Sequence, residues 1–518
     1  MAATQVAASA ETRPTLTRRQ TVLLVASLML GTALSALDTT IVGTAMPTIV
    51  GALGGIDLYS WVITVYLLTS TTTVPLYGRL ADQYGRKPVY LFGIVLFLAG
   101  SALCAVAASM EQLIVFRALQ GIGAGAILPM GMTIIGDTFS IEARARVQAF
   151  ITAVWGTSSV VGPATGALIV TYLHWGWVFL VNLPVGVAAI AMLSANYHER
   201  VVHRERSIDW LGAGLLTAAI TLLLLGLQRS AGGGQLELVG LFAGALVAGL
   251  AFVLVELRTP DPVVPLGLFA RPLIGVGYLA SFLLGAVQFG IASFVPLYVQ
   301  GAMGGDARSV GLTVMPMAIG WPVGAIASGR LIVPVGYRRV LLAGAGATAL
   351  GAAALLMLTP SSSMGQVMLP VGVVGLGMGL SNSPIVIALQ NAVGWNRRGI
   401  ITSLATFFRS IGGSCGVALM GAIVNLELVA RIGDLPRAGA GAGRRGDVVS
   451  QLLDPATRAV LGPEVVARVQ AALADALWNV YLFPAACALL GLALVVLLFP
   501  SGSVQQLAAA GANGRTEG

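Results

Sequence analysis

Long apolar runs separated by short polar segments fill the sequence from residue 21 to residue 499. A helix that crosses the hydrocarbon core of a bilayer needs about 20 consecutive, largely apolar residues. By this criterion the pattern predicts fourteen membrane-spanning helices, because the runs are too long for the strands of a membrane barrel. They lie at 21–45, 58–78, 88–109, 112–134, 147–170, 177–196, 209–228, 236–257, 274–300, 310–332, 340–358, 365–390, 400–425 and 478–499.

Composition agrees with an all-α integral membrane protein. Of the 518 residues 57% are hydrophobic and 10% are charged, whereas soluble domains carry about 25% charged residues. The lipid bilayer is therefore an expected partner, and nucleic acid is not, despite the net charge of +8. The three cysteines and three histidines show no metal-ligand spacing, and no catalytic triad or phosphate loop is present. We therefore expect neither an enzyme nor a bound metal or cofactor.

The positions of the 29 Lys and Arg residues predict the orientation of the chain. With the N-terminus in the cytoplasm, nineteen fall in cytoplasmic tails and short loops, and only Arg229 and Arg308 fall in short outer loops. Short cytoplasmic loops are enriched in these residues. Both termini are thus expected in the cytoplasm, since one miscounted helix would invert every later loop. We expect a monomer in the cytoplasmic membrane of a bacterium.

Glycine and arginine patterns recur at offsets of 250 to 254 residues, which indicates an internal repeat. The repeat predicts two six-helix bundles, at 21–199 and 261–499, with two inserted helices at 200–260 and tails at 1–20 and 500–518. Duplicated halves are typical of secondary transporters, whose substrate site lies between the halves. The recurring pairs are Gly78 and Gly329, Gly85 and Gly336, Gly121 and Gly375, Gly123 and Gly377, Gly125 and Gly379, Gly162 and Gly412, and Gly166 and Gly416.

The segment 426–477 differs in composition from the rest of the second half, being rich in Gly, Ala and Arg near 438–446. A short amphipathic helix is expected near 464–477, with Pro463 at its start. We favour a passive extracytoplasmic loop over a lid or a partner-binding surface.

The loop after the second run, from Gly78 to Lys87, combines glycines, one acid and three cations. It suits an electrostatic latch on the cytoplasmic side, the gate motif being Gly78, Asp82, Gly85, Arg86, Lys87 and Asp137. In this hypothesis Asp82 lies at the positive N-terminus of a helix from the other half, and Arg86 pairs with Asp137. The alternative is that these cations only set the topology.

Asp38 is the only carboxylate well inside an apolar run. Charge there is costly, so burial favours the protonated form, and intramembrane acids are functional by default. We interpret Asp38 as the proton-coupling residue. The alternative is a structural Asp that pairs with Arg117 or bonds to Thr39 or Thr40. The two readings are compatible, because the approach of Arg117 would release the proton.

Other residues inside the runs suggest substrate contacts or helix packing. Arg409 is either structural or meets an anionic part of a substrate. The pattern Gly121-Ile-Gly123-Ala-Gly125-Ala126 fits a dinucleotide fingerprint, but no strand precedes it, so close helix packing is the better interpretation. Gly162-Pro163 indicates a kink where the halves meet. Six aromatic residues are candidates to line a cavity for lipophilic cations: Trp61, Tyr66, Trp155, Phe289, Trp321 and Phe408.

Five motifs in order along the chain resemble those of the major facilitator superfamily. Besides Gly78–Lys87, Leu113–Gly121 with Arg117 resembles the fourth-helix motif of proton-coupled members. Gly156 through Gly162, Pro163 and Gly166 resembles the fifth-helix motif of antiporters. Leu37–Val42 and Trp175–Pro184 are similar to signatures of fourteen-helix drug:proton antiporters of the EmrB and QacA type. Gly176 stands where the last signature usually has Arg, and we expect the consequence to stay within that outer turn.

The resemblance implies a multidrug efflux antiporter that exchanges protons for small lipophilic, cationic substrates by alternating access. One alternative is a dedicated exporter of a specific metabolite, antibiotic, lipid or siderophore on the same fold. Another is a non-transporting membrane sensor or assembly partner, for which 426–477 would be the interaction surface. An importer is disfavoured, because the fifth-helix motif resembles that of antiporters.

Overall fold

The computed structural model describes residues 17–139, 141–197, 199, 209–229, 234–259, 262, 264, 266–393, 398–432, 447–453, 455–458 and 461–499. These residues form helices and no strand. The first half contains α2 (Arg18–Leu53), η1 (Ile56–Leu58), α3 (Tyr59–Thr72), α4 (Val74–Tyr84), α5 (Arg86–Ala105), α6 (Met110–Thr138), α7 (Ile141–Tyr172), α8 (Trp177–Leu180) and α9 (Asn182–Asn196).

The remaining helices include the two expected insertions and the second half of the chain. They are α10 (Trp210–Arg229), α11 (Gln235–Glu256), η2 (Leu266–Ala270), α12 (Pro272–Leu297), the π-helical turn η3 (Tyr298–Ala302), α13 (Ala307–Val335), α14 (Tyr337–Ala354), η4 (Leu355–Met357), α15 (Met364–Asn391), α16 (Arg398–Ile432), α17 (Asp447–Leu453), α18 (Pro455–Arg458) and α19 (Pro463–Leu498).

Among the described residues, twelve helices are long and apolar enough to cross a membrane. Two further predicted runs are helical but are not among these twelve. Run 58–78 covers α3 and α4, which separate at Thr73. Pro75 follows that residue and has no backbone N–H to donate to the preceding turn. Run 147–170 lies inside α7. The count of fourteen spans therefore stays a prediction.

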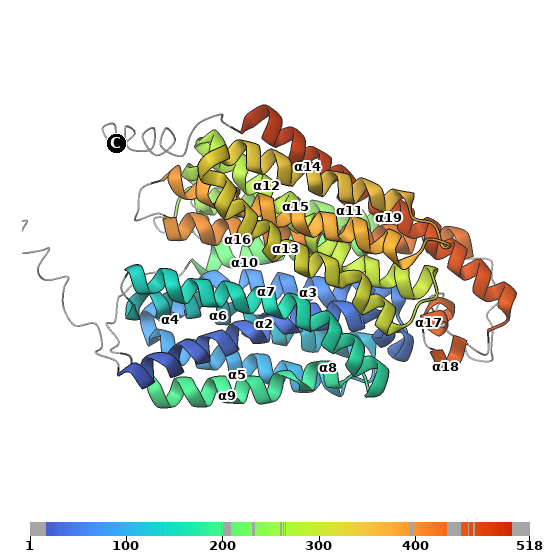
Figure 1. Cartoon of the computed structure of the whole chain (residues 1–518), viewed down its shortest axis with the longest axis horizontal. Coiled ribbons are helices and arrows are strands. Elements are labelled where there is room, and N and C mark those ends of the chain that lie inside the picture. Colours follow the sequence, from blue (N-terminus) through green and yellow to red (C-terminus); the bar gives the residue numbers. More distant parts are fainter. Residues whose placement is uncertain are drawn as a thin grey trace, which may run out of the picture.

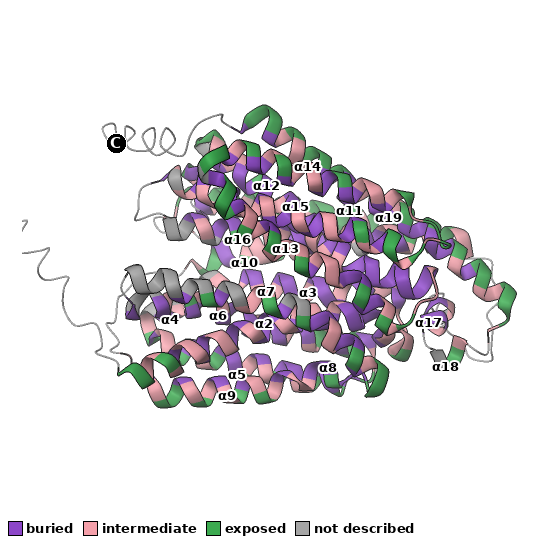
Figure 2. Ribbon diagram, viewed as in Figure 1, coloured by how far each residue is buried: buried purple, intermediate pink, exposed green. Residues whose placement is uncertain are grey.

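The two halves form two packed groups of helices (Figure 1). In the first, α2 packs on α7 and α9, and α6 packs on α3 and α5. In the second, α12 packs on α16, and α15 packs on α13 and α14. The inserted helix α10 packs on α11, α16 and α3. Buried residues concentrate between the helices (Figure 2), whereas α11 buries only Phe252 and Glu256, as suits a helix that faces lipid.

Glycines of the internal repeat occupy matching positions in the two halves. A Cβ atom on Gly121 would lie 2.7 Å from the carbonyl oxygen of Tyr66 in α3, and one on Gly375 would lie 2.4 Å from that of Met317 in α13. The next small residues face α5 and α14 in the same way, since a Cβ on Gly123 or Gly377 would overlap the backbone there. Close helix approach is thus confirmed as the role of this pattern.

The Gly78–Lys87 motif and its repeat also match in structure, and in each copy the chain reverses at a single glycine. Gly85 and Gly336 adopt positive φ angles of 95° and 87°, which L side chains rarely reach. Each separates two helices, α4 from α5 and α13 from α14. The prediction of a loop beginning at Gly78 is corrected, because residues 78–84 continue the helix α4 and the chain reverses at Gly85.

The segment 426–477 is more helical than predicted. α16 continues to Ile432, and α19 runs without a break from Pro463 to Leu498. The amphipathic stretch at 464–477 is therefore the first part of the last long helix, not a separate short helix. It buries Val469, Leu473 and Leu477, and these contacts let the helix extend past the apolar run.

The halves meet at the end of the molecule opposite the start of α2 and the end of α19 (Figure 1). There the hydroxyl of Tyr59 donates to the carbonyl of Ser293, and Asn425 Nδ2 donates to the carbonyl of Asp57 over 2.9 Å. α17 packs on α2 and η1 of the first half and on α19 and η3 of the second. This end is closed by contacts across the halves.

Candidate functional site

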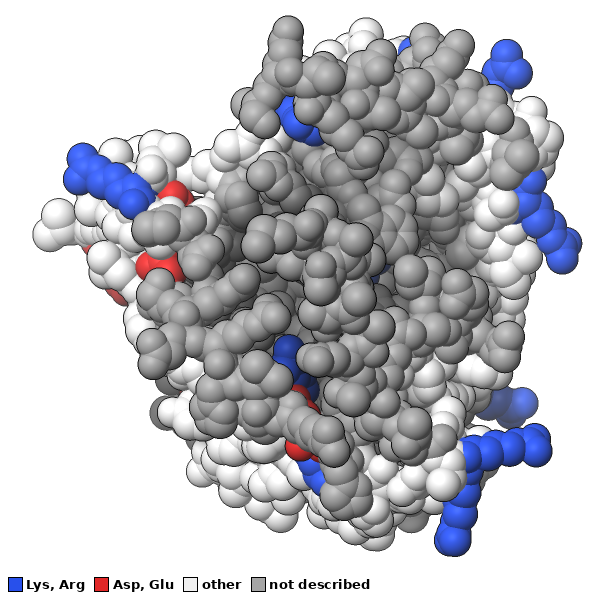
Figure 3. Space-filling view, turned by 90° about the vertical axis from the view of Figure 1, so that its left-hand side faces the viewer, with Lys and Arg blue, Asp and Glu red and all other residues white. Residues whose placement is uncertain are grey.

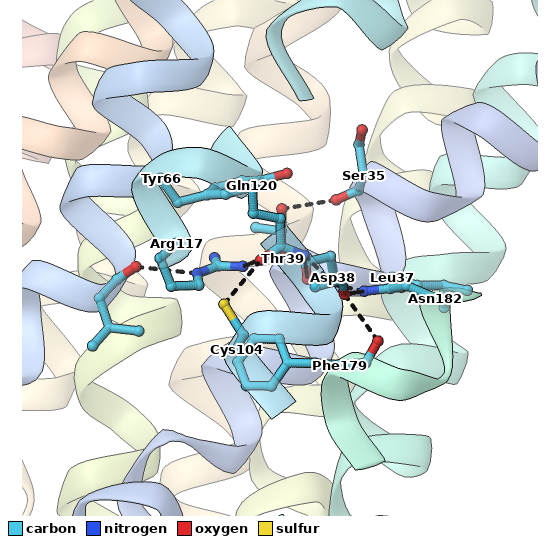
Figure 4. Close-up of polar contacts among 12 residues, drawn as sticks. Ser35, Leu37, Asp38, Thr39, Tyr66, Cys104, Arg117, Gln120, Phe179 and Asn182 are labelled. Atoms are coloured by element: carbon cyan, nitrogen blue, oxygen red, sulfur yellow. Dashed lines mark hydrogen bonds and ion pairs between the residues drawn. The ribbon is translucent and has the colours of Figure 1, made fainter. Parts of the chain in front are cut away.

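Four helices of the first half bring buried polar side chains together around Asp38 (Figure 4). Asp38 lies in α2, Arg117 and Gln120 in α6, Ser101 in α5, and Asn182 is the first residue of α9. Gln120 follows Arg117 by three residues, so one helical face carries both. Ser101 and Arg117 lie within about two turns of the connection between α5 and α6. The site is therefore nearer the closed end.

The carboxylate of Asp38 accepts three hydrogen bonds. Arg117 Nη1 donates to Asp38 Oδ2 over 2.6 Å, and both side chains are almost completely buried, with 2% of the Arg117 side chain and 0% of the Asp38 side chain exposed. Gln120 Nε2 donates to Asp38 Oδ1 over 2.8 Å, and Asn182 Nδ2 donates to the same atom over 3.1 Å. Every partner is a donor, so the arrangement fits the charged form of Asp38.

A second set of bonds fixes these donors. Ser101 Oγ accepts from Gln120 Nε2 and Asn182 Nδ2, at 3.2 and 3.0 Å, and donates to the carbonyl of Phe179 at 2.9 Å. Gln120 Oε1 in turn accepts from Arg117 Nη1 over 2.8 Å. The network is thus closed, which positions both amides with their N–H groups toward the carboxylate.

Arg117 is held by backbone and aromatic contacts as well as by charge. Its Nε donates to the carbonyl of Val62 in α3 over 3.3 Å. Its guanidinium carbon lies 4.1 Å from the ring centre of Tyr66 and 5.9 Å from that of Phe179. The predicted cavity residue Tyr66 is therefore buried at the ion pair, where its ring stabilises the cation.

The Asp38 carboxylate can bind either a proton or the guanidinium of Arg117. Protonation of Asp38 would remove the negative charge and turn one acceptor oxygen into a hydroxyl donor, so the side chain would accept these three bonds less well. The buried Arg117 cation then loses its counter-ion, which is costly in a water-poor environment. The bonds to the Asp38 carboxylate therefore connect α2 with α6 and α9.

Sequence reasoning singled out Asp38 and Arg117 but assigned no role to Ser101, Gln120 or Asn182. Gln120 was detectable from its spacing to Arg117. Asn182 was detectable as a polar residue within the apolar run 177–196. Ser101 carries no signal, because single serines are common in membrane helices.

In the gate motif, the structure adds a partner that the sequence did not indicate. The carboxylate of Glu199 accepts from the backbone N–H groups of Arg86 and Lys87, both over 2.8 Å, and lies 3.6 Å from Arg86 Nη1. Lys87 Nζ also donates to the carbonyl of Ser194 over 2.9 Å. An acid thus caps the positive N-terminus of α5. The side chains of Asp82 and Asp137 lie outside the described residues, so their predicted pairings stay predictions.

The residues of the antiporter motif face two different helices. Gly162 and Gly166 pack on α2, where a Cβ on Gly162 would lie 1.9 Å from Thr40 Oγ1. Gly156 and Pro163 instead face α13 of the other half, with Gly156 opposite Pro322 and the carbonyl of Pro163 opposite Gly311. The motif therefore lies where the halves meet, as expected, and the kink itself stays a prediction.

Gly176 lies in the turn between α7 and α8 and packs on the end of α5. A Cβ atom there would lie 2.5 Å from the carbonyl oxygen of Ala105. Gly176 has a helical conformation that any residue adopts, so the close approach of α5 is what favours glycine here. The expectation that the departure from the family signature acts only within this turn stays a prediction.

The predicted cavity aromatics do not form one cluster. Trp61 packs on α10 and α16 in a small core with Leu68 and Leu224. Phe408 stacks on Tyr278, with ring centres 5.0 Å apart, within an aromatic cluster of the second half. Phe289 lies against Gly413. Trp155 is half-buried in α7.

Trp321 and Arg409 are brought together. The guanidinium carbon of Arg409 lies 6.0 Å from the ring centre of Trp321, and Nη1 donates to Asn382 Oδ1 over 3.1 Å. Arg409 is half-buried and lies 11 residues from the start of α16. Both readings of this residue, structural and substrate-binding, remain compatible with these contacts.

A helical membrane protein with duplicated halves and a buried charged pair in one of them has the design of a secondary transporter. The family model of the Major Facilitator Superfamily matches residues 28–417. The chain belongs to this superfamily, whose members are transporters, so the expectation that it is not an enzyme is confirmed.

Two curated relatives come from Bacillus subtilis. Multidrug transporter protein MdtP is 39% identical over 418 residues, which cover 80% of this chain and 76% of the relative. Multidrug resistance protein 3 is 34% identical over 483 residues, which cover 92% and 94%. Among solved structures, a bacterial homologue of the human lysosomal transporter Spinster, in an inward-facing unoccupied conformation, superposes with a TM-score of 0.65. It is 15% identical and covers 93% of this chain and 98% of its own, so it supports the fold alone.

Proposed function

We propose that this chain is a proton-driven multidrug antiporter that exports small lipophilic, mainly cationic compounds across the cell membrane of a bacterium. The observation that carries the proposal is the buried pair of Asp38 and Arg117, 2.6 Å apart, inside a closed set of hydrogen bonds. The names of the two Bacillus relatives support multidrug export. The proposed topology has fourteen spans and both termini in the cytoplasm.

Charge distribution supports this orientation. Figure 3 shows the end of the molecule on which α2 starts and α19 ends, and it carries several Lys and Arg side chains and few acids. Cytoplasmic surfaces of membrane proteins have this excess of cations. The closed end with α17 is then extracytoplasmic, and the structure corresponds to the state in which the outer side is shut.

In the proposed cycle, Asp38 takes up a proton while the outer side is open. The halves then rock to the state described here, Arg117 and the two amides bind the carboxylate as the proton leaves, and substrate enters from the cytoplasm. Exchange of two protons for one monovalent cation, or of one proton for a neutral compound, moves one net charge across the membrane. At 100 mV that charge supplies about 2.3 kcal/mol, which sustains a gradient of about 50-fold by the rule of tenfold per 1.4 kcal/mol. The proton gradient is therefore sufficient to drive export without ATP.

Everted membrane vesicles test this proposal. Wild-type vesicles should accumulate the cationic dye rhodamine 123 when a proton gradient is imposed, and a protonophore should abolish the accumulation. Asp38→Asn should remove the gradient dependence, whereas Asp306→Asn, a change at an exposed carboxylate that caps α13, should retain it. Full gradient-driven accumulation by Asp38→Asn would overturn the proposal. Transport of one compound alone in a substrate panel would indicate a dedicated exporter instead.

A further inference from the structure

The two intramembrane arginines of the described chain have contrasting surroundings. Arg117 contacts a carboxylate, an amide oxygen, a backbone carbonyl and an aromatic ring. Arg409 has an amide oxygen, that of Asn382, and an aromatic ring, that of Trp321. Among the described residues, no carboxylate forms an ion pair with Arg409. The contact that Arg409 lacks is therefore the anion.

A cation without a counter-ion in this position is costly. Arg409 lies 11 residues from the start of α16 and 23 from its end at Ile432, which places it within the bilayer-spanning part of the helix. Arginines inside membrane helices pair with acids or carbonyl groups, or they mark substrate pathways. Asn382 is uncharged, so its hydrogen bond to Arg409 does not neutralise the charge of the guanidinium.

The surroundings of Arg409 are built from three helices and are partly open. Asn382 comes from α15 and Trp321 from α13, and both are half-buried like Arg409 itself. The backbone of Arg409 packs on α12, because a Cβ on Gly285 would lie 1.9 Å from its carbonyl oxygen. One turn further along the same two helices, the ring of Phe289 covers Gly413. The guanidinium of Arg409 therefore has the ring of Trp321 beside it and the ring of Phe289 one helical turn away.

The location also suits contact with a transported compound. Gly156 of the antiporter motif lies opposite Pro322, the neighbour of Trp321, across the boundary between the halves. Trp321 and Arg409 thus belong to the part of the second half that adjoins this boundary. Substrates of duplicated transporters bind between the halves near the midplane.

We propose that Arg409 is a substrate-binding residue that takes the carboxylate of lipophilic zwitterions and anions, held by Asn382 and flanked by Trp321. A guanidinium presents paired N–H donors that match a carboxylate, and charge-assisted bonds of this kind are strong. The substrate carboxylate then pairs with Arg409 as the carboxylate of Asp38 pairs with Arg117. This proposal rests on the proposed export function and extends its substrate class from cations to amphiphiles with an acidic group.

Two dyes that share one ring system test the proposal. Rhodamine 123 is a cationic methyl ester, and rhodamine 110 carries the free carboxylate instead. Equilibrium dialysis against purified protein in nanodiscs would measure the binding of each dye to wild type, Arg409→Gln, Arg409→Lys and Arg308→Gln. Glutamine keeps a donor for Asn382, lysine keeps the charge, and Arg308 is an exposed cation near the closed end, which provides the matched control.

We expect Arg409→Gln to weaken the binding of rhodamine 110 by tenfold or more and that of rhodamine 123 by less than twofold. Arg409→Lys should retain part of the affinity for rhodamine 110, and Arg308→Gln should change neither. Equal losses for both dyes would show a structural arginine and overturn the proposal, as would unchanged binding of rhodamine 110 or failure of wild type to bind it. Loss of gradient-driven transport with this selectivity intact would instead count against the proposed function alone.

Discussion

Arg117 and Asp38 form an ion pair 2.6 Å long that is sealed inside the first half of the molecule. The residues are 79 positions apart and come from α6 and α2. Breaking a buried pair by removing one partner costs about 3–5 kcal/mol, because the remaining charge has no compensation. The pair is therefore a structural contact between α2 and α6.

Removing the cation should destabilise the fold more than removing both charges. We expect Arg117→Gln to lower the free energy of unfolding by about 3–5 kcal/mol, and the double variant Asp38→Asn, Arg117→Gln to recover part of this loss. Denaturant titration of purified protein in detergent measures both. If the double variant were less stable than the single one by the full cost of a second change, the two charges would not be coupled.

The amide of Asn182 should contribute to transport through its bond to the buried pair. Asn182→Ala removes one of the three donors to the Asp38 carboxylate, so gradient-driven dye efflux should fall severalfold. The matched control is Asn196→Ala, at the other end of α9, where the amide donates to the carbonyl of Met192. Efflux by Asn182→Ala equal to that of the control would show that this donor does not contribute to the site.

Contacts between the halves at the closed end should open during transport. A Cβ on Gly311 would lie 2.9 Å from that of Ala167, so α7 and α13 must move apart by about 1 Å to reach the mean of about 3.8 Å in disulfides. We expect Ala167→Cys with Gly311→Cys to form a disulfide under oxidation and to stop dye efflux, and reduction to restore it. Each single variant serves as control. Undiminished efflux by the fully cross-linked protein would contradict alternating access at this end.

Close helix packing should depend on the glycines that lie at helix contacts and not on glycines elsewhere. A Cβ on Gly377 would lie 2.5 Å from the backbone nitrogen of Thr348, whereas one on Gly346 would meet nothing within 4 Å. Gly377→Ala should lower the midpoint of thermal unfolding by several degrees, and Gly346→Ala should leave it unchanged or raise it, because alanine favours helices. Equal effects of the two changes would contradict the packing described here.

Much of this structure follows from the sequence because charges are scarce and apolar runs are long. The helices and the paired glycines could be predicted from these features. Asp38 and Arg117 could be found as charges inside apolar runs. Their coming together depends on how α2 and α6 pack. The sequence allows this pairing as one alternative for Asp38, and periodicity alone could not establish it.

Other parts could not be predicted from local patterns. Ser101 and Asn182 are neutral, and their role appears only when the four helices α2, α5, α6 and α9 meet. Glu199 is 113 residues from Arg86 in sequence, so its cap on α5 is a property of the fold. The unbroken helix α19 depends on contacts that bury Val469 and Leu473, whereas in sequence its polar start and apolar end look like two segments.

The most direct test of the central claim is to count the protons that leave the protein when substrate binds. Purified wild type in weakly buffered detergent solution should release protons on addition of rhodamine 123, as measured by a pH-sensitive dye, and Asp306→Asn should do the same. Asp38→Asn should bind the compound and release none. Equal release by Asp38→Asn and wild type would show that the coupling proton resides elsewhere.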